Sequence, residues 1–221
     1  PPCSDAPAAT AEARLWLDVT ERSIGATGDW THKVELADVD GDGRVDLLFA
    51  NGGNYDSPGS PTLSQVFLNR GPEQAFQEVT QQLLGPTPRW VRVVKVRDLN
   101  GDGQPDIMLG ATFQTQSQLY LASGSGNFVN VTTTQLPQID ASIGDLEFGD
   151  VDADGDLDVV LADWGPGSPM SNAGGRTLLW LNDGAGHFSD ATATQMPDDL
   201  RVSITNAPGK DAYPISSFTY F

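Results

Sequence analysis

The strongest constraint on this chain is an Asp-rich segment of nine residues that occurs three times. The copies read DVDGDGRVD, DLNGDGQPD and DVDADGDLD and begin at Asp38, Asp98 and Asp150. Each copy leads into a short apolar run whose bulk and β-branching favour a buried strand. These runs are Leu47 to Phe49, Ile107 to Leu109 and Val159 to Leu161. Because such repeats are supersecondary units that stack on one another, the sequence predicts a repeat architecture.

Two further marks repeat in register with the Asp-rich segments. Upstream, the triplets DVT, EVT and NVT each end a strand-like segment at Thr20, Thr80 and Thr132, always 18 residues before the first Asp. Downstream, QVFLNRG, QLYLASGSGNF and LLWLNDGAGHF each combine a strand-like run with a Gly-rich turn. The segments start 60 and then 52 residues apart, a spacing that suits four-stranded propeller blades. No long amphipathic helical pattern is present. We therefore expect an all-β fold of about three blades.

The repeat pattern has limits at both ends of the chain. The triplet mark recurs at Thr192, but Lys210 stands where a fourth Asp-rich segment would begin. We therefore expect a flexible leader over 1–14, a repeat region over 15–197 and a non-repeat tail over 198–221. The single cysteine, Cys3, falls in the Pro/Ala-rich leader. Both a free thiol and a lipid-modified anchor are open interpretations of it.

The charge of the chain is strongly negative and unevenly distributed. There are 30 acidic and 12 basic residues, for a net charge of −18, and twelve of the acidic residues lie in the three Asp-rich segments. Such a surface repels nucleic acid and attracts cations. No apolar run approaches the roughly 18 residues that a membrane span needs. We therefore expect neither a nucleic-acid partner nor a transmembrane segment.

The spacing of the acidic residues predicts three calcium sites. In the pattern D-x-[DN]-x-D-G-x-x-D, alternate side chains point to a common centre, and Ca²⁺ prefers carboxylate and carbonyl oxygens. Each predicted site has four side chains and one backbone carbonyl, at the seventh position. The side-chain ligands are Asp38, Asp40, Asp42 and Asp46; Asp98, Asn100, Asp102 and Asp106; and Asp150, Asp152, Asp154 and Asp158, and the carbonyls are those of Arg44, Gln104 and Asp156.

Three other interpretations of these segments fit the residues less well. Asp/Gly turns on an acidic surface explain one match better than three in register. Magnesium demands a tight octahedron and keeps much of its water, whereas these segments offer many oxygens. An EF-hand needs an acidic residue at position twelve, where the three copies have Phe49, Leu109 and Leu161. Calcium, with about three ions bound, is the expectation, and three ions would bring the formal charge from −18 to −12.

No catalytic motif stands out, and we expect a protein that is not an enzyme. The two histidines, His32 and His187, lie in different repeat contexts and outside any nucleophile or metal motif. Nucleophile-elbow, zinc-protease, dinucleotide and phosphate-loop patterns do not occur. Asn130 lies in a glycosylation triplet, but it also occupies the repeated upstream mark, which favours a structural role.

Taken together, the segments, the strands after them and the Gly-rich turns resemble the FG-GAP or VCBS-type repeats of integrin α-chain propellers and of many secreted bacterial proteins. The resemblance covers roughly residues 15 to 197. It implies blades of four antiparallel strands, structural calcium between neighbouring strands of a blade, and partners that bind elsewhere. Propellers of this family close with more blades than three. The last 20 or so residues instead resemble the C-terminus of periplasmic phosphate-binding receptors of ABC transporters.

Three functions follow as hypotheses. The first is an extracellular, cell-surface or periplasmic calcium-binding module for adhesion or for protein or glycan binding. The second is a structural unit that assembles with other copies of itself into an oligomer or filament, because three blades leave faces uncovered. The third is a phosphate-capture protein fused to repeats, suggested by the tail alone.

Overall fold

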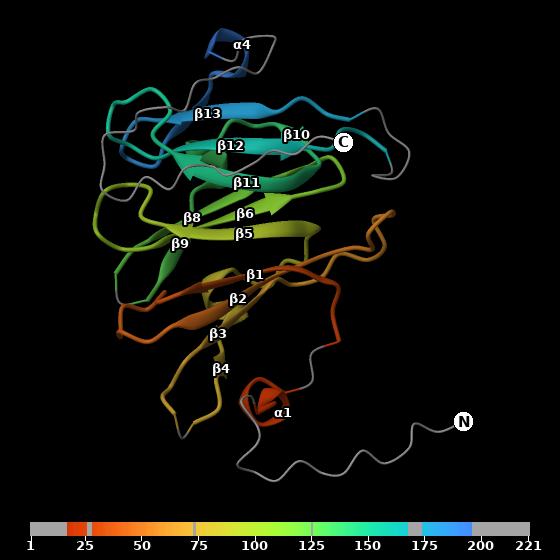
Figure 1. Cartoon of the computed structure of the whole chain (residues 1–221), viewed down its shortest axis with the longest axis vertical. Coiled ribbons are helices and arrows are strands. Elements are labelled where there is room, and N and C mark those ends of the chain that lie inside the picture. The colour runs from red at the N-terminus through yellow and green to blue at the C-terminus, as the bar shows by residue number, and fades with distance from the viewer. Residues whose placement is uncertain (1–16, 26–27, 73, 125, 168–173, 196–221) are drawn as a thin grey trace.

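Three four-stranded antiparallel sheets, one for each predicted repeat, form the body of the protein (Figure 1). The computed structural model describes residues 17–25, 28–72, 74–124, 126–167 and 174–195. The predicted tail over 198–221, the leader over 1–14 and Cys3 lie outside these residues. The all-β prediction of four-stranded blades is confirmed. No helix in the described ranges is long and apolar enough to cross a membrane.

Each sheet, called here a blade, is a meander in which consecutive strands pair. Blade 1 contains β1 (Thr31–Ala37), β2 (Asp46–Asn51), β3 (Gln65–Leu68) and β4 (Gln77–Glu78). Blade 2 contains β5 (Val91–Arg97), β6 (Asp106–Ala111), β8 (Gln118–Ala122) and β9 (Phe128–Asn130). Blade 3 contains β11 (Ile143–Gly149), β12 (Asp158–Asp163), β13 (Leu178–Asn182) and β14 (Phe188–Asp190). The short strands β7 (Thr115–Gln116) and β10 (Asp140–Ala141) pair with each other beside blades 2 and 3.

The blades lie side by side, with apolar cores between them. The first strands are neighbours, since β1 and β11 both contact β5. One buried cluster joins blade 1 to blade 2, and a second joins blade 2 to blade 3. Trp180 on β13 is the largest fully buried side chain of the second cluster. Burial of both faces of the middle blade explains the continuous apolar run from Ile107 to Leu109 on its second strand, β6.

Four one-turn helices follow the triplet marks, and the sequence did not predict them. They are α1 (Thr20–Ser23), α2 (Thr80–Leu83), α3 (Thr132–Gln135) and α4 (Thr192–Gln195). Four residues are too few to show a helical period.

The structure gives the threonine of the mark a role. The Thr80 hydroxyl accepts a hydrogen bond from the backbone N–H of Val66 at 3.0 Å, and Thr132 and Thr192 do the same for the third strands of their own blades. Thr20, in α1, is exposed. The side chain of Asn130 accepts a hydrogen bond from the backbone N–H of Thr132. That bond supports the structural interpretation of the NVT triplet.

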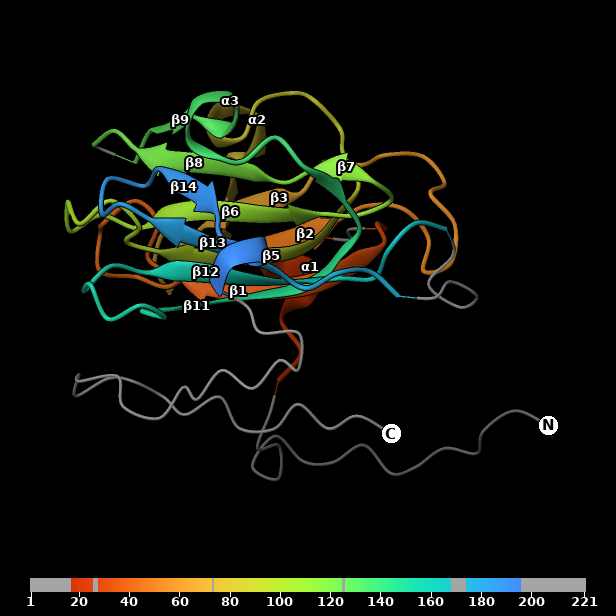
Figure 2. The same ribbon diagram turned by 90° about the horizontal axis from the view of Figure 1, so that it is seen from above.

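The two ends of the blades carry different loops. Because the first two strands of a blade form a hairpin, all three Asp-rich segments lie at the same end of the sheets, on the left of Figures 1 and 2. The loops after β2, β6 and β12 lie at the opposite end. The fold thus places the predicted metal sites together and apart from the other long loops.

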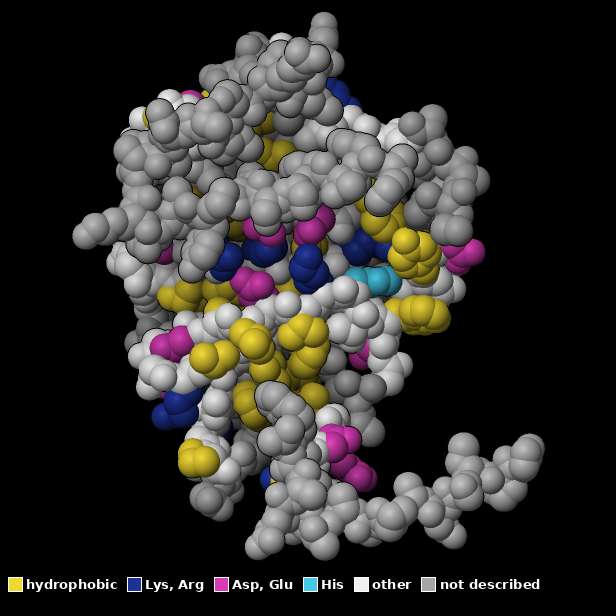
Figure 3. Space-filling model, in the orientation of Figure 1, with side chains coloured by type: hydrophobic (Ala, Val, Ile, Leu, Met, Phe, Trp, Pro, Cys, Tyr) yellow, Lys and Arg dark blue, Asp and Glu magenta, His cyan; other side chains and the backbone are white. Residues whose placement is uncertain are grey.

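Charged side chains cross between the first strands of the blades. Lys33 on β1 reaches Asp145 on β11 at 3.1 Å, and Arg97 on β5 reaches Glu35 on β1 at 2.9 Å. Lys95 pairs with Glu147 in the same way. Figure 3 shows basic and acidic side chains gathered in a band across this face. These pairs connect all three blades.

Candidate metal centre

Each Asp-rich segment forms the loop between the first and second strands of its blade. Its ninth residue begins the second strand: Asp46 opens β2, Asp106 opens β6 and Asp158 opens β12. All three of these carboxylates are completely buried. The position after each loop that would be the twelfth residue of an EF-hand lies within a strand, so the predicted continuation of loop into strand is confirmed.

The first Asp of each loop organises the turn through backbone hydrogen bonds. The carboxylate of Asp38 accepts bonds from the N–H groups of Gly41 at 2.9 Å and Gly43 at 2.8 Å. Gly41 and Gly43 have φ angles of 75° and 84°, which only glycine adopts readily. Asp98 accepts the same two bonds, from Gly101 and Gly103, in the second loop. In the third loop Asp150 accepts bonds from the N–H groups of Asp154 and Gly155. The loop conformation is therefore encoded by the first Asp and by the glycine at the sixth position, which all three loops share, while Ala153 takes the positive φ of the fourth position in the third loop.

The ninth Asp fixes each loop to the rest of its blade. One oxygen of Asp46 accepts a bond from the N–H of Val39 at 2.9 Å, and the other accepts one from Asn69 at 2.8 Å, just after β3. Asp106 binds the N–H groups of Leu99 and Ala122 in this way, and Asp158 binds those of Val151 and Asn182. The ninth position therefore has a structural role in addition to its predicted role as a ligand.

Burial makes these ninth carboxylates costly to ionise without a compensating charge. It raises the pKa of Asp46, Asp106 and Asp158, and neighbouring carboxylates of the same loop raise it further. Backbone N–H donors oppose the increase in all three cases. A cation at the centre of the loop would offset both the burial and the repulsion.

The carboxylates come together most closely in the first and third loops. Oxygens of Asp38, Asp40 and Asp42 lie within 4.8 Å of one another, as do oxygens of Asp150, Asp152 and Asp158. In the second loop the third position is an amide. The side-chain nitrogen of Asn100 donates to Asp102 at 3.2 Å, and its oxygen accepts from the N–H of Asp102 at 3.0 Å. The donor sets consist of oxygens alone and fit a hard divalent cation.

The first loop already has basic neighbours. Arg70, in the turn after β3, lies 2.9 Å from a carboxylate oxygen of Asp40 and 3.7 Å from one of Asp42. Arg44 also pairs with Asp42. From the sequence, only the backbone carbonyl of Arg44 was predicted to be a metal ligand, and Arg70 was not identified. These two guanidinium groups compete with a metal ion for the same oxygens.

The third loop is the most acidic and has no such competitor. Over the described ranges, no Lys or Arg side chain forms an ion pair with any carboxylate between Asp150 and Asp158. Desolvation, followed by repulsion from Asp154 and Asp150, raises the pKa of Asp156. By electrostatics this loop is the best candidate for a divalent cation. The predicted carbonyl ligands of Arg44, Gln104 and Asp156 remain predictions.

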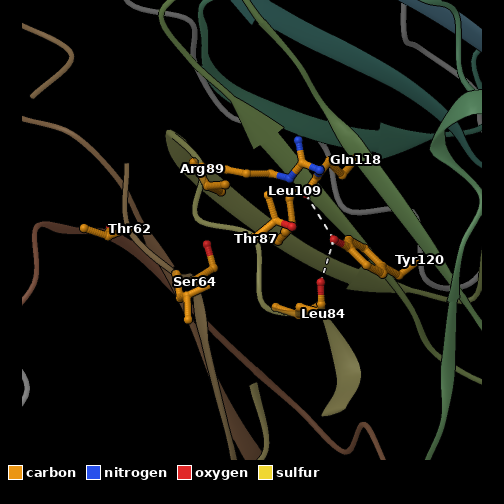
Figure 4. Close-up of a pocket in the computed structure, with 11 residues that line it drawn as sticks. Thr62, Ser64, Leu84, Thr87, Arg89, Leu109, Gln118 and Tyr120 are labelled. Atoms are coloured by element: carbon orange, nitrogen blue, oxygen red, sulfur yellow. Dashed lines mark hydrogen bonds between the residues drawn. The ribbon is translucent and has the colours of Figure 1, made fainter. Parts of the chain in front are cut away.

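The hollow between blades 1 and 2 is too small to be a second functional site. It is lined by polar groups such as Arg89, Gln118 and Tyr120, and the hydroxyl of Tyr120 bonds to the Leu84 carbonyl and the Gln118 side chain (Figure 4). Its free volume of about 10 Å³ is space for a single water molecule.

The two histidines lie in separate places. Nε2 of His32 lies 2.9 Å from the carbonyl oxygen of Gly52, in the loop after β2. Nδ1 of His187 lies 3.8 Å from Asp183, in the turn between β13 and β14. Each thus has a local partner within its own blade.

Comparison with known proteins agrees with this geometry. Residues 38–109 and 98–161 match the FG-GAP-like repeat, and the two matches together span more than half of the chain. Over 114 residues the chain is 25% identical to integrin alpha-6 of Gallus gallus. This match covers 51% of the present chain and 11% of the integrin chain. Each family match begins at one Asp-rich loop and ends in the strand that follows the next Asp-rich loop. The chain belongs to the FG-GAP-like repeat family.

Proposed function

We propose that this chain is an extracellular, cell-surface or periplasmic calcium-binding module that serves adhesion or the binding of a protein or glycan, and that it is not an enzyme. The observation that carries the proposal is the third loop, where oxygens of Asp150, Asp152 and Asp158 lie within 4.8 Å of one another and have no basic partner in the described chain. Family membership and the similarity to an integrin α-chain support this assignment.

In this proposal calcium is structural. The ion would be held by the first, third, fifth and ninth side chains and the seventh carbonyl of each loop. Since the ninth Asp also binds the backbone after the third strand, an ion in the loop would connect the first three strands of a blade. Millimolar extracellular calcium suits sites built on exposed loops. The loops would stiffen the blades while partners bind elsewhere on the surface.

The proposal that the chain is not an enzyme rests on how the carboxylates are used. Acid catalysis needs a carboxyl group that can hold and release a proton at working pH. The dense carboxylate clusters lie in the three loops, where their oxygens accept backbone N–H groups and where bound calcium would keep them ionised. The phosphate-capture hypothesis rests on residues outside the described ranges and stays a hypothesis.

Thermal unfolding with calcium and with a chelator tests the calcium proposal. A ligand that binds only the folded state at about 100 times its dissociation constant stabilises it by about 2.7 kcal/mol. We therefore expect a clear decrease in Tm on chelation. Titration calorimetry should count about three ions. An unchanged Tm together with no heat of calcium binding would refute the proposal.

A matched pair of variants locates the effect. Asp152→Ala removes a carboxylate from the third-loop cluster, and Asp56→Ala removes an exposed carboxylate from the loop after β2. We expect Asp152→Ala to lose one ion and part of the calcium-dependent increase in Tm. Asp56→Ala should bind calcium like the unmodified chain. Equal behaviour of the two variants would argue against a third-loop site.

A further inference from the structure

Blade 1 has an apolar face that is uncovered among the described residues. Val34 and Leu36 on β1 are 48% and 61% exposed, and they pair across the sheet with Phe49 and Leu47 on β2. We call these four residues the blade-1 face. Figure 3 shows hydrophobic side chains gathered over β1 and β2 at this place. Large apolar groups side by side on a surface are typical of an interface.

The same positions are buried in blade 2, and in blade 3 one is buried while Phe148, the counterpart of Leu36, is partly buried. Val94 and Val96 on β5 are the counterparts of Val34 and Leu36, and they are 1% and 4% exposed. In blade 3, Leu146 takes the place of Val34 and is 1% exposed. The side chain types hardly differ between blades. What differs is the presence of a neighbour.

The chain itself shows what kind of surface covers this face. The opposite face of blade 1, which includes Leu48, Ala50 and Val66, packs in one cluster with Val94 and Val96 of blade 2. The corresponding residues of blade 2, Met108 and Leu119, pack in the second cluster with Leu146, Val159 and Leu161 of blade 3. Each covered face therefore meets the opposite face of the preceding blade.

Blade 3 has a surface of the covering type. Leu179, which corresponds to Val66 of blade 1, is already buried at 1% exposure. By register, Val160, Ala162 and Leu181 correspond to Leu48, Ala50 and Leu68 of blade 1, and all three are only partly buried. We call them the blade-3 face. We propose that the blade-1 face is an interface between copies of this chain and binds the blade-3 face of a second copy. The contact repeats, between molecules, the packing seen twice within the molecule.

This contact joins two different surfaces, so each copy keeps one free face after pairing. Head-to-tail contacts of this kind produce rings or open chains rather than a single closed dimer. The net charge of −18 per copy opposes association, and salt screens such repulsion. Association should therefore grow with protein concentration and strengthen at higher ionic strength. It does not require calcium, so it can fail or hold independently of the calcium proposal.

Sedimentation equilibrium of the full 221-residue chain over a wide concentration range is the first test. We expect masses above that of the monomer, increasing with concentration and with sodium chloride. The double variant Val34→Thr/Leu36→Gln should remain monomeric, because it removes apolar surface without adding charge. The control is Val129→Thr on β9, which removes a methyl group from a side chain of similar exposure, 52%, away from the face. The control should associate like the unmodified chain.

A complementation test distinguishes head-to-tail pairing from other modes. The second double variant, Val160→Thr/Leu181→Gln, alters only the blade-3 face and should also be monomeric. Mixed with the first variant, it still offers an intact blade-1 face to an intact blade-3 face. We expect the mixture to form a dimer that stops at two copies. Circular dichroism confirms that each variant is folded.

Several results would overturn the proposal. One is a monomer at every concentration and salt level. Another is association that persists in the Val34→Thr/Leu36→Gln variant, which would place the contact elsewhere. A mixture of the two folded variants that remains monomeric would exclude pairing between these two faces. Loss of association in Val129→Thr as well would show that the effect is not specific to the blade-1 face.

Discussion

The guanidinium carbon of Arg92 lies 4.6 Å from the centre of the Trp164 ring. Tyr55 and Phe113 also face this cation, at 5.4 and 5.7 Å. The three aromatic residues come from the loops after β2, β6 and β12, one from each blade. Arg92 lies at a register irregularity in β5, between Val91 and Val93, which redirects its side chain. One side chain thus ties the three blades together at the end opposite the Asp-rich loops.

Arg92 makes these contacts without a carboxylate partner in the described chain. It is 4% exposed, and burial lowers its pKa from the usual value. Nη2 donates to the carbonyl oxygens of Tyr55 at 3.2 Å and Asn54 at 3.4 Å, while Nε has no hydrogen-bond partner among the described residues. Aromatic faces therefore supply much of the compensation for the buried charge.

When Arg92 is replaced, the loss of stability should depend on the shape of the new side chain more than on its charge. Arg92→Lys keeps a cation but loses the flat group that stacks on rings, and we expect a loss of about 1–3 kcal/mol in the free energy of unfolding. Arg92→Met removes the buried charge and keeps apolar bulk, so it should cost less than Arg92→Lys. Urea denaturation measures both. The exposed Arg97→Lys is the control, expected within about 0.5 kcal/mol. A larger loss for methionine than for lysine would contradict this account.

The position of the Trp164 ring depends in turn on Gly144. This glycine lies at the register irregularity of β11 that corresponds to the one at Arg92 in β5. A Cβ atom at Gly144 would lie 2.0 Å from Nε1 of the indole, whereas a Cβ at Gly149 in the same strand has no neighbour within 4 Å. Gly144→Ala should therefore displace the indole and cost about 1–3 kcal/mol of stability. Gly149→Ala should be close to neutral. Chemical denaturation compares the two, and similar losses would mean that the indole moves freely.

The repeated threonine offers a third comparison. The Thr132 hydroxyl accepts the buried N–H of Leu119 at 3.0 Å, whereas Thr20 is exposed. Thr132→Val keeps the shape but leaves that N–H without a partner, which costs about 1–3 kcal/mol. Thr20→Val makes the same change where no buried donor depends on it and should alter stability by less than about 0.5 kcal/mol. The midpoints of urea unfolding decide this. Equal shifts of the urea midpoint in the two variants would mean that the hydroxyl of Thr132 does not stabilise the blade by accepting the N–H of Leu119.

The first Asp-rich loop should bind calcium more weakly than the third, because Arg70 already lies 2.9 Å from Asp40. Removing that competitor with Arg70→Gln should raise the affinity of the first loop about two- to fivefold, the range expected for a partly exposed ion pair. The control Arg22→Gln removes a basic residue from α1, so it matches the change in net charge. Calorimetric titration of both variants measures the effect. An equal gain in the control would assign it to net charge alone.

The sequence predicted the repeating parts of the structure well. The Asp-rich loops, the strands that start at Asp46, Asp106 and Asp158, and the Gly-rich turns follow local patterns that recur in register. A local pattern is enough because a loop bonded to its own backbone needs no distant residue to define it. The number of strands per blade followed from the family resemblance and the spacing.

Other features depend on contacts between repeats, and the sequence did not reveal them. Arg92 meets Tyr55, Phe113 and Trp164 although these residues lie far apart in the chain and at different offsets from their strands. The one-turn helices are too short for a periodic signal. Arg70 was missed because a single basic residue in a turn has no motif, and only the folded turn places it against the first loop.

Tyr120 gives the chain an alkaline limit to its stability. Its phenol is buried between blades and lies 3.1 Å from the Leu84 carbonyl oxygen and from the Gln118 side-chain oxygen. Burial raises its pKa above the ordinary value of 10.0. The folded state therefore holds the phenol proton more tightly than the unfolded state. The corresponding stability is fully present below about pH 10 and is lost as pH rises through the folded pKa.

The variant Tyr120→Phe should remove that alkaline slope and should cost stability at neutral pH, because the Leu84 carbonyl and the Gln118 side chain lose a donor. Tyr55→Phe, at a half-exposed ring, is the control and should keep the slope. Urea midpoints measured from neutral to strongly alkaline pH follow both variants, and the ultraviolet absorbance of tyrosinate shows when Tyr120 ionises. A slope that survives in Tyr120→Phe would assign the alkaline loss to other groups that lose a proton in this range, such as the paired lysines Lys33 and Lys95.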